Sequence, residues 1–376
     1  MQAGIIEIVL QWQRRELFKG SNNLFNFHPY RNFGAKVHTN KEKTKSKGDN
    51  LVKQREKLVF LPVLRYLRSM KSPRNKTLTL TEAERKELRK RLFSLRRMPE
   101  TLQDVTIRAD LLKVIDRLPD HFADLIIIDP PYNLSKRFGT SQFKAGSDDD
   151  YRAYIRSWLP HVIEKLKPDG TLYLCGDWRS SVVLYDEISP FLHMLNRITW
   201  QRDKGRGAAH NWKNAMEDIW YAVANPKDYC FHVEAVMQRR RVVAPYRQDG
   251  KPKDWEETAE GNFRNTCPSN FWDDISIPYW SMAENTAHPT QKPEKLIAKL
   301  ILASSEPGDM VFDPFLGSGT TSVVAKKLGR HYCGVEIDET YACLAEKRLL
   351  LAETDKVIQG YDDGVFWERN TRRPTS

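Results

Sequence analysis

The stretch LIIIDPPY, residues 125–132, decides the fold of this chain. A leucine followed by three isoleucines is typical of a strand that is buried on both faces of a sheet. Asp129 comes directly after this run, at the carboxyl end of the predicted strand, where the functional groups of parallel sheets project. Pro130 and Pro131 then fix the backbone and remove two N–H donors. We therefore expect an α/β fold with a chemical site at Asp129.

Strand and helix patterns alternate on both sides of this stretch. Further strands are predicted at 105–110, 171–177, 197–202, 217–225, 309–315 and 331–338. Helices are predicted at 82–95, 111–120, 158–167, 182–195, 295–305, 322–329 and 341–350. Thr81, with Glu84 three residues on, forms a capping-box pattern at the start of the first helix. Residues 226–287 and the tail from Asp355 show no regular pattern, so we expect an irregular insertion and a tail without strands.

A glycine-rich turn, LGSGTT (316–321), follows the predicted strand at 309–315. Its glycines let the backbone approach a ligand closely. Glu336 ends the next predicted strand, where a carboxylate can accept hydrogen bonds from ribose hydroxyls. This layout is typical of a nucleotide-type crevice. By itself it fits NAD, a flavin, S-adenosylmethionine or a simple turn of the chain.

The tetrad Asp129-Pro130-Pro131-Tyr132 offers hydrogen-bond acceptors and one aromatic ring. The lone pair of an exocyclic amine on a nucleobase is delocalised into the ring, so transfer of a methyl group to that nitrogen requires the lone pair to be freed. A carboxylate and the Pro130 carbonyl, both accepting from the amine, favour the tetrahedral nitrogen of the transition state. Tyr132 supplies a flat face on which an extruded base can stack. The tetrad therefore favours chemistry on a base amine.

Three motifs together resemble a known family: DPPY (129–132), HPTQKP (288–293) and DPFLGSGTT (313–321). In this order, from about Asp104 to Leu350, the chain resembles the β group of S-adenosylmethionine-dependent DNA amino-methyltransferases. The resemblance implies that the DPPY residues are catalytic and that Thr290 and Lys292 bind the methionine carboxylate of the cofactor. The cofactor-binding residues that it implies are Asp110, Thr290, Lys292, Asp313, Phe315, Gly317, Ser318, Gly319, Thr320 and Glu336.

The order of the motifs implies a circularly permuted, Rossmann-like methyltransferase sheet. In an unpermuted fold, the strand ending at Glu336 would be followed by another strand with its own acid. No such strand follows Leu350, whereas VTIRAD (105–110) precedes the DPPY unit. We therefore expect residues 105–110 to lie beside the strand that ends at Glu336. Asp110 is then the candidate partner of the cofactor adenine, although the family usually has Gly-Asp where this chain has Ala-Asp.

The resemblance implies methyl transfer from S-adenosylmethionine to N6 of adenine in double-stranded DNA, directly and on a flipped base. The chain lacks the Pro-Cys motif of the carbon-5 enzymes, because Cys267-Pro268 runs in the reverse order. Asp129 favours adenine, since enzymes that act on N4 of cytosine more often have serine there. An N4-cytosine enzyme, an RNA methyltransferase and a non-catalytic DNA-binding subunit remain as alternatives. A homodimer and a cognate restriction endonuclease are left open as partners.

Basic and aromatic residues gather between the two sets of motifs. Residues 197–253 hold 12 basic and six acidic side chains, and six of the ten tryptophans fall between positions 200 and 280. Basic side chains that neutralise phosphates and aromatic rings that stack on bases are typical of nucleic-acid contacts. We expect 228–287 to be the target-recognition region, with Arg239, Arg240 and Arg241 as DNA-binding candidates. Residues 133–151 form either a loop that closes over the flipped base or an ordinary surface loop.

The charge of the chain is unevenly distributed. Of the 376 residues, with a net charge of +11, the first hundred hold 24 Lys and Arg against nine Asp and Glu. We expect this basic head to be an accessory DNA contact. The five expected parts are a basic N-terminal extension (1–75), a catalytic half (76–227), the target-recognition region (228–287), a cofactor-binding half (288–352) and a C-terminal tail (353–376).

Cysteine usage and hydropathy bear on compartment. The five cysteines include no C-x-x-C pair, so neither a metal site nor a disulfide framework is expected. No apolar run approaches the length of a membrane span, about 18 residues or more. We therefore expect no membrane association and a cytoplasmic protein that associates with the nucleoid.

Overall fold

The structure is a computed structural model that describes residues 73–138, 141–202, 209–242, 246–259 and 261–368. The predicted basic extension, 1–75, lies almost wholly outside these residues. The described residues belong to one compact unit, Lys71–Ser376.

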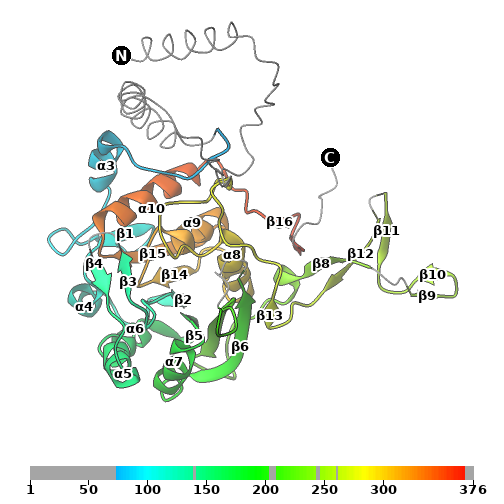
Figure 1. Ribbon diagram of the computed structural model, residues 1–376, viewed down its shortest axis with the longest axis horizontal. Helices are drawn as coiled ribbons and strands as arrows, with labels where there is room; N and C mark the ends of the chain where they lie inside the picture. The colour runs from blue at the N-terminus through cyan, green and yellow to red at the C-terminus, as the bar shows by residue number, and fades with distance from the viewer. Residues whose placement is uncertain (1–72, 139–140, 203–208, 243–245, 260, 369–376) are drawn as a thin grey trace, which may run out of the picture. The chain divides into compact units, whose positions relative to one another are not determined.

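An eight-stranded sheet forms the centre of this unit (Figure 1). Its strands, in spatial order, are β1 (Val105–Arg108), β15 (His331–Glu336), β14 (Met310–Asp313), β2 (Ala123–Ile128), β5 (Leu166–Gly176), β7 (Met216–Val223), β6 (His193–Gln201) and β13 (Phe271–Trp272). The first five run parallel to one another, whereas β7 is antiparallel to both of its neighbours. This sheet confirms the predicted α/β, Rossmann-like methyltransferase class.

The position of β1 confirms the predicted permutation. β1 pairs in parallel with β15, with Val105 opposite Cys333 and Arg108 opposite Glu336. A strand from before the DPPY motif therefore lies beside a strand from near the end of the chain. The carboxyl ends of β2, β14, β15 and β1 consequently meet along one edge of the sheet, and this edge carries the motifs.

Two layers of helices cover the sheet. One layer contains α4 (Leu111–Val114), η1 (Ile115–Arg117), α5 (Asp148–Arg156), α6 (Leu159–Ile163) and α7 (Ser180–Ile188). The other contains α8 (Glu294–Ala303), α9 (Thr320–Lys327) and α10 (Glu339–Leu351). In β2, Ile126 and Ile128 pack with the first layer, and Leu125 and Ile127 pack with the second. The isoleucine run is thus buried on both faces, as predicted.

Three predicted helices have different bounds, and one of them, predicted at 182–195, is α7, which ends at Ile188, while residues 193–195 belong to β6. α3 (Glu82–Arg89) begins with the predicted capping box of Thr81 and Glu84, but it ends well before residue 95. Leu92 is nevertheless buried against α10, although it lies beyond the end of α3. The predicted helix at 158–167 is also wrong at its end, because Leu166 already belongs to β5, where it pairs with Ala123.

The insertion and the tail contain strands that the sequence analysis did not predict. A five-stranded sheet joins β11 (Glu256–Thr258), β12 (Gly261–Thr266), β8 (Gln238–Arg241), β17 (Val365–Trp367) and β16 (Tyr361–Asp362). β17 comes from the tail and pairs in parallel with β8, with Phe366 opposite Gln238. Figure 1 shows β8 and β12 leading away from the central sheet toward the hairpin of β9 (Arg247–Gln248) and β10 (Lys251–Pro252). The prediction failed because these strands are short and mostly polar.

Residues 133–151 also contain regular structure. A hairpin of β3 (Lys136–Phe138) and β4 (Ser141–Phe143) follows the DPPY tetrad. α5 then begins after Ser147, whose side chain forms a capping box with Asp150. The hairpin leaves the same strand end that carries Asp129 and is therefore positioned beside the site.

Candidate functional site

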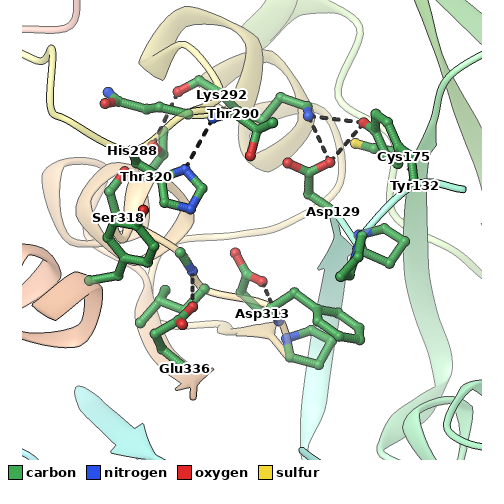
Figure 2. A pocket seen from close by; sticks show the side chains of 18 of the residues that line it. Asp129, Tyr132, Cys175, His288, Thr290, Lys292, Asp313, Ser318, Thr320 and Glu336 are labelled. Atoms are coloured by element: carbon green, nitrogen blue, oxygen red, sulfur yellow. Dashed lines mark hydrogen bonds and ion pairs between the residues drawn. The ribbon is translucent and has the colours of Figure 1, made fainter. Parts of the chain in front are cut away.

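A cavity of about 350 Å³ opens at the carboxyl ends of β2, β14 and β15 (Figure 2). Its lining brings together the three motifs, which are far apart in the sequence. The predicted residues that line it are Asp110, Asp129, Pro130, Pro131, Tyr132, Thr290, Lys292, Asp313, Phe315, Gly317, Ser318, Thr320 and Glu336. Of the predicted catalytic and cofactor-binding residues, Gly319 is absent from this lining.

At one end of the cavity, the DPPY tetrad meets the lysine of HPTQKP. The Nζ atom of Lys292 lies 2.7 Å from Oδ1 of Asp129 and donates to the Tyr132 hydroxyl at 3.0 Å. The Tyr132 hydroxyl in turn donates to Oδ1 of Asp129 at 2.8 Å. Figure 2 shows these three side chains pointing toward one another. The structure therefore places Lys292 against the predicted catalytic carboxylate.

Glu217, which the sequence analysis did not single out, is the fourth member of this cluster. It lies in β7, is only 4% exposed, and its Oε2 is 3.1 Å from Lys292 Nζ. Its Oε1 is 2.6 Å from Arg202, at the end of β6. Glu217 could have been recognised in the sequence, because it lies in the largely apolar stretch EDIWYAV. Buried acids are rare unless they are paired.

The two carboxylates determine the charge state of the cluster. Burial disfavours the Lys292 ammonium, but the charges of Asp129 and Glu217 outweigh this effect and hold the pKa of Lys292 above its usual range. Burial and the same two carboxylates also raise the pKa of Tyr132, so its phenol stays neutral. Lys136 of β3 lines the cavity as well, and burial together with Arg202 and Lys292 lowers its pKa.

The glycine turn is shaped by close contacts. Gly317 and Gly319 have φ angles of 56° and 84°, in the left-handed region that favours glycine. A Cβ on Gly319 would lie 2.5 Å from the Cβ of Ala345 in α10, so this glycine lets two helices approach each other. A Cβ on Gly317 would lie 3.1 Å from the His288 ring. The HPTQKP and glycine-rich motifs are thus packed directly against each other.

Buried carboxylates line the other end of the cavity. Glu336 Oε2 accepts from the Gly317 amide at 2.7 Å, and its Oε1 accepts from the Asp338 amide at 2.8 Å. Asp313 Oδ1 accepts from the Phe315 amide at 3.0 Å. Burial raises the pKa of Glu336 and of Asp313 to about 7 each. Both acids are therefore sensitive to pH in the neutral range.

The remaining cofactor candidates occupy three positions around the same cavity. Asp110 follows β1 and caps α4 by accepting from the Leu112 amide at 3.2 Å. Thr320 begins α9, and its hydroxyl donates to the Lys292 carbonyl at 3.1 Å. The Phe315 ring packs edge-on against Trp158, with ring centroids 4.9 Å apart. These three residues therefore belong to the wall of the same cavity.

The three predicted DNA-binding arginines have different surroundings. Arg239 is 2.6 Å from Glu256 and packs over the rings of Phe263 and Trp367, so its guanidinium is engaged within the inserted sheet. Arg240 donates to Gln238. Arg241 is exposed at the end of β8. Since side chains alternate between the two faces of a strand, the three do not share one face.

Comparison with known proteins agrees with this geometry. A family model described as DNA methylase matches residues 123–347. The type II methyltransferase M.HpaI of Haemophilus parainfluenzae is 33% identical over 68% of this chain and 76% of its own length. The DNA adenine methyltransferase YhdJ of Escherichia coli K12 is 32% identical over 65% of this chain and 82% of its own length.

A solved structure, that of the M1.HpyAVI complex with SAM, is 23% identical, covers 65% of this chain and 98% of its own, and has a TM-score of 0.45. Within the described part of the chain, we find no helix long and apolar enough to span a membrane. The family match covers more than half of the sequence, and its region contains all three motifs. The chain therefore belongs to the DNA methylase family.

Proposed function

We propose that this protein transfers a methyl group from S-adenosylmethionine to N6 of adenine in double-stranded DNA. The observation that carries the proposal is that Asp129 and Tyr132 share one cavity with Glu336 and the glycine turn. One end of the cavity suits a base amine, and the other suits the ribose and adenine of a cofactor. The name of the relative YhdJ, a DNA adenine methyltransferase, supports the choice of base.

The cavity has the size and the polar groups that the cofactor needs. Its volume of about 350 Å³ falls within the usual range of small-molecule sites, about 300–1,000 Å³. Glu336 and Asp110 lie at the ends of the paired strands β15 and β1, where their carboxylates can accept from ribose hydroxyls and from the adenine amine. Phe315 and Ile337 add apolar surface. When bound, S-adenosylmethionine supplies a methyl group made electrophilic by its sulfonium.

Asp129 is the proton acceptor in this mechanism. The incoming amine donates to the Asp129 carboxylate and to the Pro130 carbonyl, which draws the nitrogen lone pair out of the ring system. The cofactor would supply the methyl group to the amine nitrogen, and the Asp129 carboxylate would take the amine proton that is released. The Lys292 ammonium, 2.7 Å away, forms an ion pair with the Asp129 carboxylate and holds it in place. The Tyr132 ring provides the stacking face for the base.

Glu217 acts as a positioning residue in this arrangement. It does not need to touch the base, because it holds Lys292 on one side and Arg202 on the other. Its negative charge offsets the buried Lys292 ammonium, which lies beside the reacting carboxylate, and the partly exposed Arg202 guanidinium. Lys292 is thereby kept against Asp129 and not drawn toward solvent.

Trp212 is the candidate for contact with the bases of the duplex. Its side chain is 93% exposed, in the connection between β6 and β7. Arg202 and Asn214, which flank it in the sequence, line the cavity. A flipped base leaves a gap in the stack, and an exposed aromatic ring in a connection that also contributes to the cavity lining is suited to fill it. We assign target recognition to residues 228–287, in line with the resemblance.

The proposal requires double-stranded DNA as the substrate, and a protein that acts in the cytoplasm on nucleoid DNA. A homodimer and a cognate restriction endonuclease remain predictions of the resemblance. The decisive experiment incubates the full chain with unmodified DNA and S-adenosylmethionine and then analyses the nucleosides. We expect N6-methyladenine. N4-methylcytosine as the sole product would overturn the choice of base, and methylation of RNA without methylation of duplex DNA would overturn the choice of substrate.

A further inference from the structure

Three side chains of metal-ligand type meet outside the cavity. Cys230 and His232 lie in the connection between β7 and η2 (Glu234–Val236), and Glu306 follows α8. His232 Nε2 is 2.8 Å from Cys230 Sγ and 2.8 Å from Glu306 Oε1. The three ligand atoms lie within 4.8 Å of one another. One ion at the centre could therefore reach all of them.

Hydrogen bonding alone does not account for this geometry. An imidazole nitrogen carries either one proton or one lone pair in the ring plane. If Nε2 of His232 is protonated, its single proton is shared between Glu306 and the sulfur, so neither acceptor receives a full hydrogen bond. If Nε2 is unprotonated, it can accept from the Cys230 thiol, but its lone pair then faces the Glu306 carboxylate at 2.8 Å. A cation resolves the conflict, because all three atoms can present lone pairs to it.

We propose that Cys230, His232 and Glu306 bind one zinc ion. Thiolate and imidazole are ligands that zinc prefers, and a carboxylate oxygen can be the third protein ligand, with a water in the fourth position. The thiolate argues against magnesium and calcium, which take oxygen ligands. The His232 and Glu306 side chains are 37% and 61% exposed, so an ion can enter from solvent.

The surrounding charge supports a cation at this place. Asp309 and Asp124 add negative charge that acts on Cys230, and Arg330 offsets part of it. Zinc binding would release the thiol proton of Cys230, because coordination deprotonates a thiol.

The ion would join two parts of the chain. Cys230 and His232 lie where the inserted region leaves β7, whereas Glu306 lies in the connection from α8 to β14 of the central sheet. The His232 amide already donates to the Ala303 carbonyl at 2.7 Å, so the two segments are in contact without the ion. Zinc would fix this junction and restrict the motion of the segment that leads into β8.

The test measures zinc binding by the full chain carrying no histidine tag. After metal is removed, Zn²⁺ is titrated in competition with a coloured chelator. We expect one zinc per chain, and at least tenfold weaker binding for Cys230→Ser and for Glu306→Gln. Glu306 is exposed, so that variant will fold. The matched control is Cys267→Ser, because Cys267 is an exposed cysteine outside the cluster and should leave binding unchanged.

Two further measurements do not depend on methylation. With Co²⁺ in place of Zn²⁺, the wild type should show thiolate-to-cobalt charge-transfer absorption that Cys230→Ser lacks. Zinc should also slow hydrogen exchange of the amides at 228–236 in the wild type but not in Cys230→Ser. Equal zinc binding by the wild type, Cys230→Ser and Glu306→Gln would overturn the site, as would substoichiometric binding by all three. The cluster would then be a hydrogen-bonded one only.

Discussion

The Nζ atom of Lys292 lies 2.7 Å from Oδ1 of Asp129, so a residue of HPTQKP contacts the first residue of DPPY. The resemblance assigns this lysine to the cofactor carboxylate, whereas the geometry places it between two protein carboxylates, those of Asp129 and Glu217. An ammonium at this point can influence both the methyl acceptor and the methyl donor. The cluster of Asp129, Tyr132, Glu217 and Lys292 is therefore the part of the site in which substitutions are most informative.

Asp129→Ala is expected to abolish methylation and leave cofactor binding within a few-fold. The variant removes the group that accepts from the base amine and takes its proton, and such groups contribute about a hundredfold or more to the rate. Single-turnover methylation and equilibrium binding of S-adenosylmethionine measure the two effects. Asp149→Asn, on the exposed side of α5, is the control. Turnover like that of the wild type would remove Asp129 from the mechanism.

Glu217→Gln is expected to lower the methylation rate about tenfold or more without weakening the binding of S-adenosylmethionine. Glutamine is nearly isosteric, but it lacks the charge that holds Lys292 and Arg202 in place. The rate constant should fall, while the KM for S-adenosylmethionine should stay within a few-fold. Glu217→Asp, which restores the charge at a shorter reach, should recover part of the rate. If Glu217→Gln and the wild type have equal methylation rates, Glu217 has no positioning role.

Cofactor affinity should rise as the pH increases from 6 to 8. Burial raises the pKa of Glu336 and Asp313 to about 7, so both are partly protonated at the lower pH, and the ionised form is the better acceptor for ribose hydroxyls. Titration calorimetry at several pH values measures the effect, which we expect to be several-fold. Glu336→Gln should bind more weakly and with a flatter pH profile. If the cofactor affinity of Glu336→Gln depended on pH as steeply as that of the wild type, Glu336 would not be the source of the pH dependence.

The same pKa shift affects stability with the opposite sign. The unfolded carboxyl releases its proton near pH 4.5, whereas folded Glu336 keeps it up to about pH 7. The unfolding free energy of the cofactor-free protein should therefore fall as pH rises between these values, by on the order of 3 kcal/mol. Urea denaturation of the wild type and Glu336→Gln, at pH 5 and pH 7.5, isolates this contribution. A larger fall in the unfolding free energy of Glu336→Gln than in that of the wild type would contradict this contribution of Glu336.

Gly319→Ala is expected to destabilise the fold by about 2–4 kcal/mol. Its φ of 84° is strained for alanine, and the new Cβ would lie 2.5 Å from that of Ala345. The matched control is Gly308→Ala, where φ is 92° but the Cβ would meet nothing within 4 Å. The control should cost only the backbone strain of a left-handed alanine, about 1–2 kcal/mol. Chemical denaturation compares the two, and equal losses would show that the contact with α10 is unimportant.

Trp212→Ala is expected to weaken extrusion of the target base, and Trp212→Phe should preserve much of it. An aromatic ring beside the cavity can stack in the gap that the base leaves, with about 1–3 kcal/mol of stacking energy. The fluorescence of 2-aminopurine at the target position reports extrusion. Phe191→Ala is the control, because Phe191 is exposed beyond the far end of α7. If Trp212→Ala showed the same increase in 2-aminopurine fluorescence as the wild type, Trp212 would have no role in base flipping.

Local pattern determined much of the fold. The isoleucine run defines β2 because a strand buried on both faces needs apolar side chains at every position, and this requirement is visible in a few residues. The permutation followed from a missing strand at one end of the chain and a surplus strand at the other. The DPPY and glycine-rich motifs follow predicted strands, where the functional groups of parallel sheets project, but only the structure shows that both border one cavity.

Tertiary structure alone decided which side chains meet. Glu217 comes from a strand whose pattern looks like core, and only the pairing of β7 beside β5 brings it to Lys292. The inserted sheet is also non-local, since β8 is completed by β17 from the tail. Short polar strands carry too little periodicity to be recognised, because their pairing partners, and not their own side chains, stabilise them. The sequence thus determined the chemistry and the order of the sheet, while the folded chain decided the partners of each charged group.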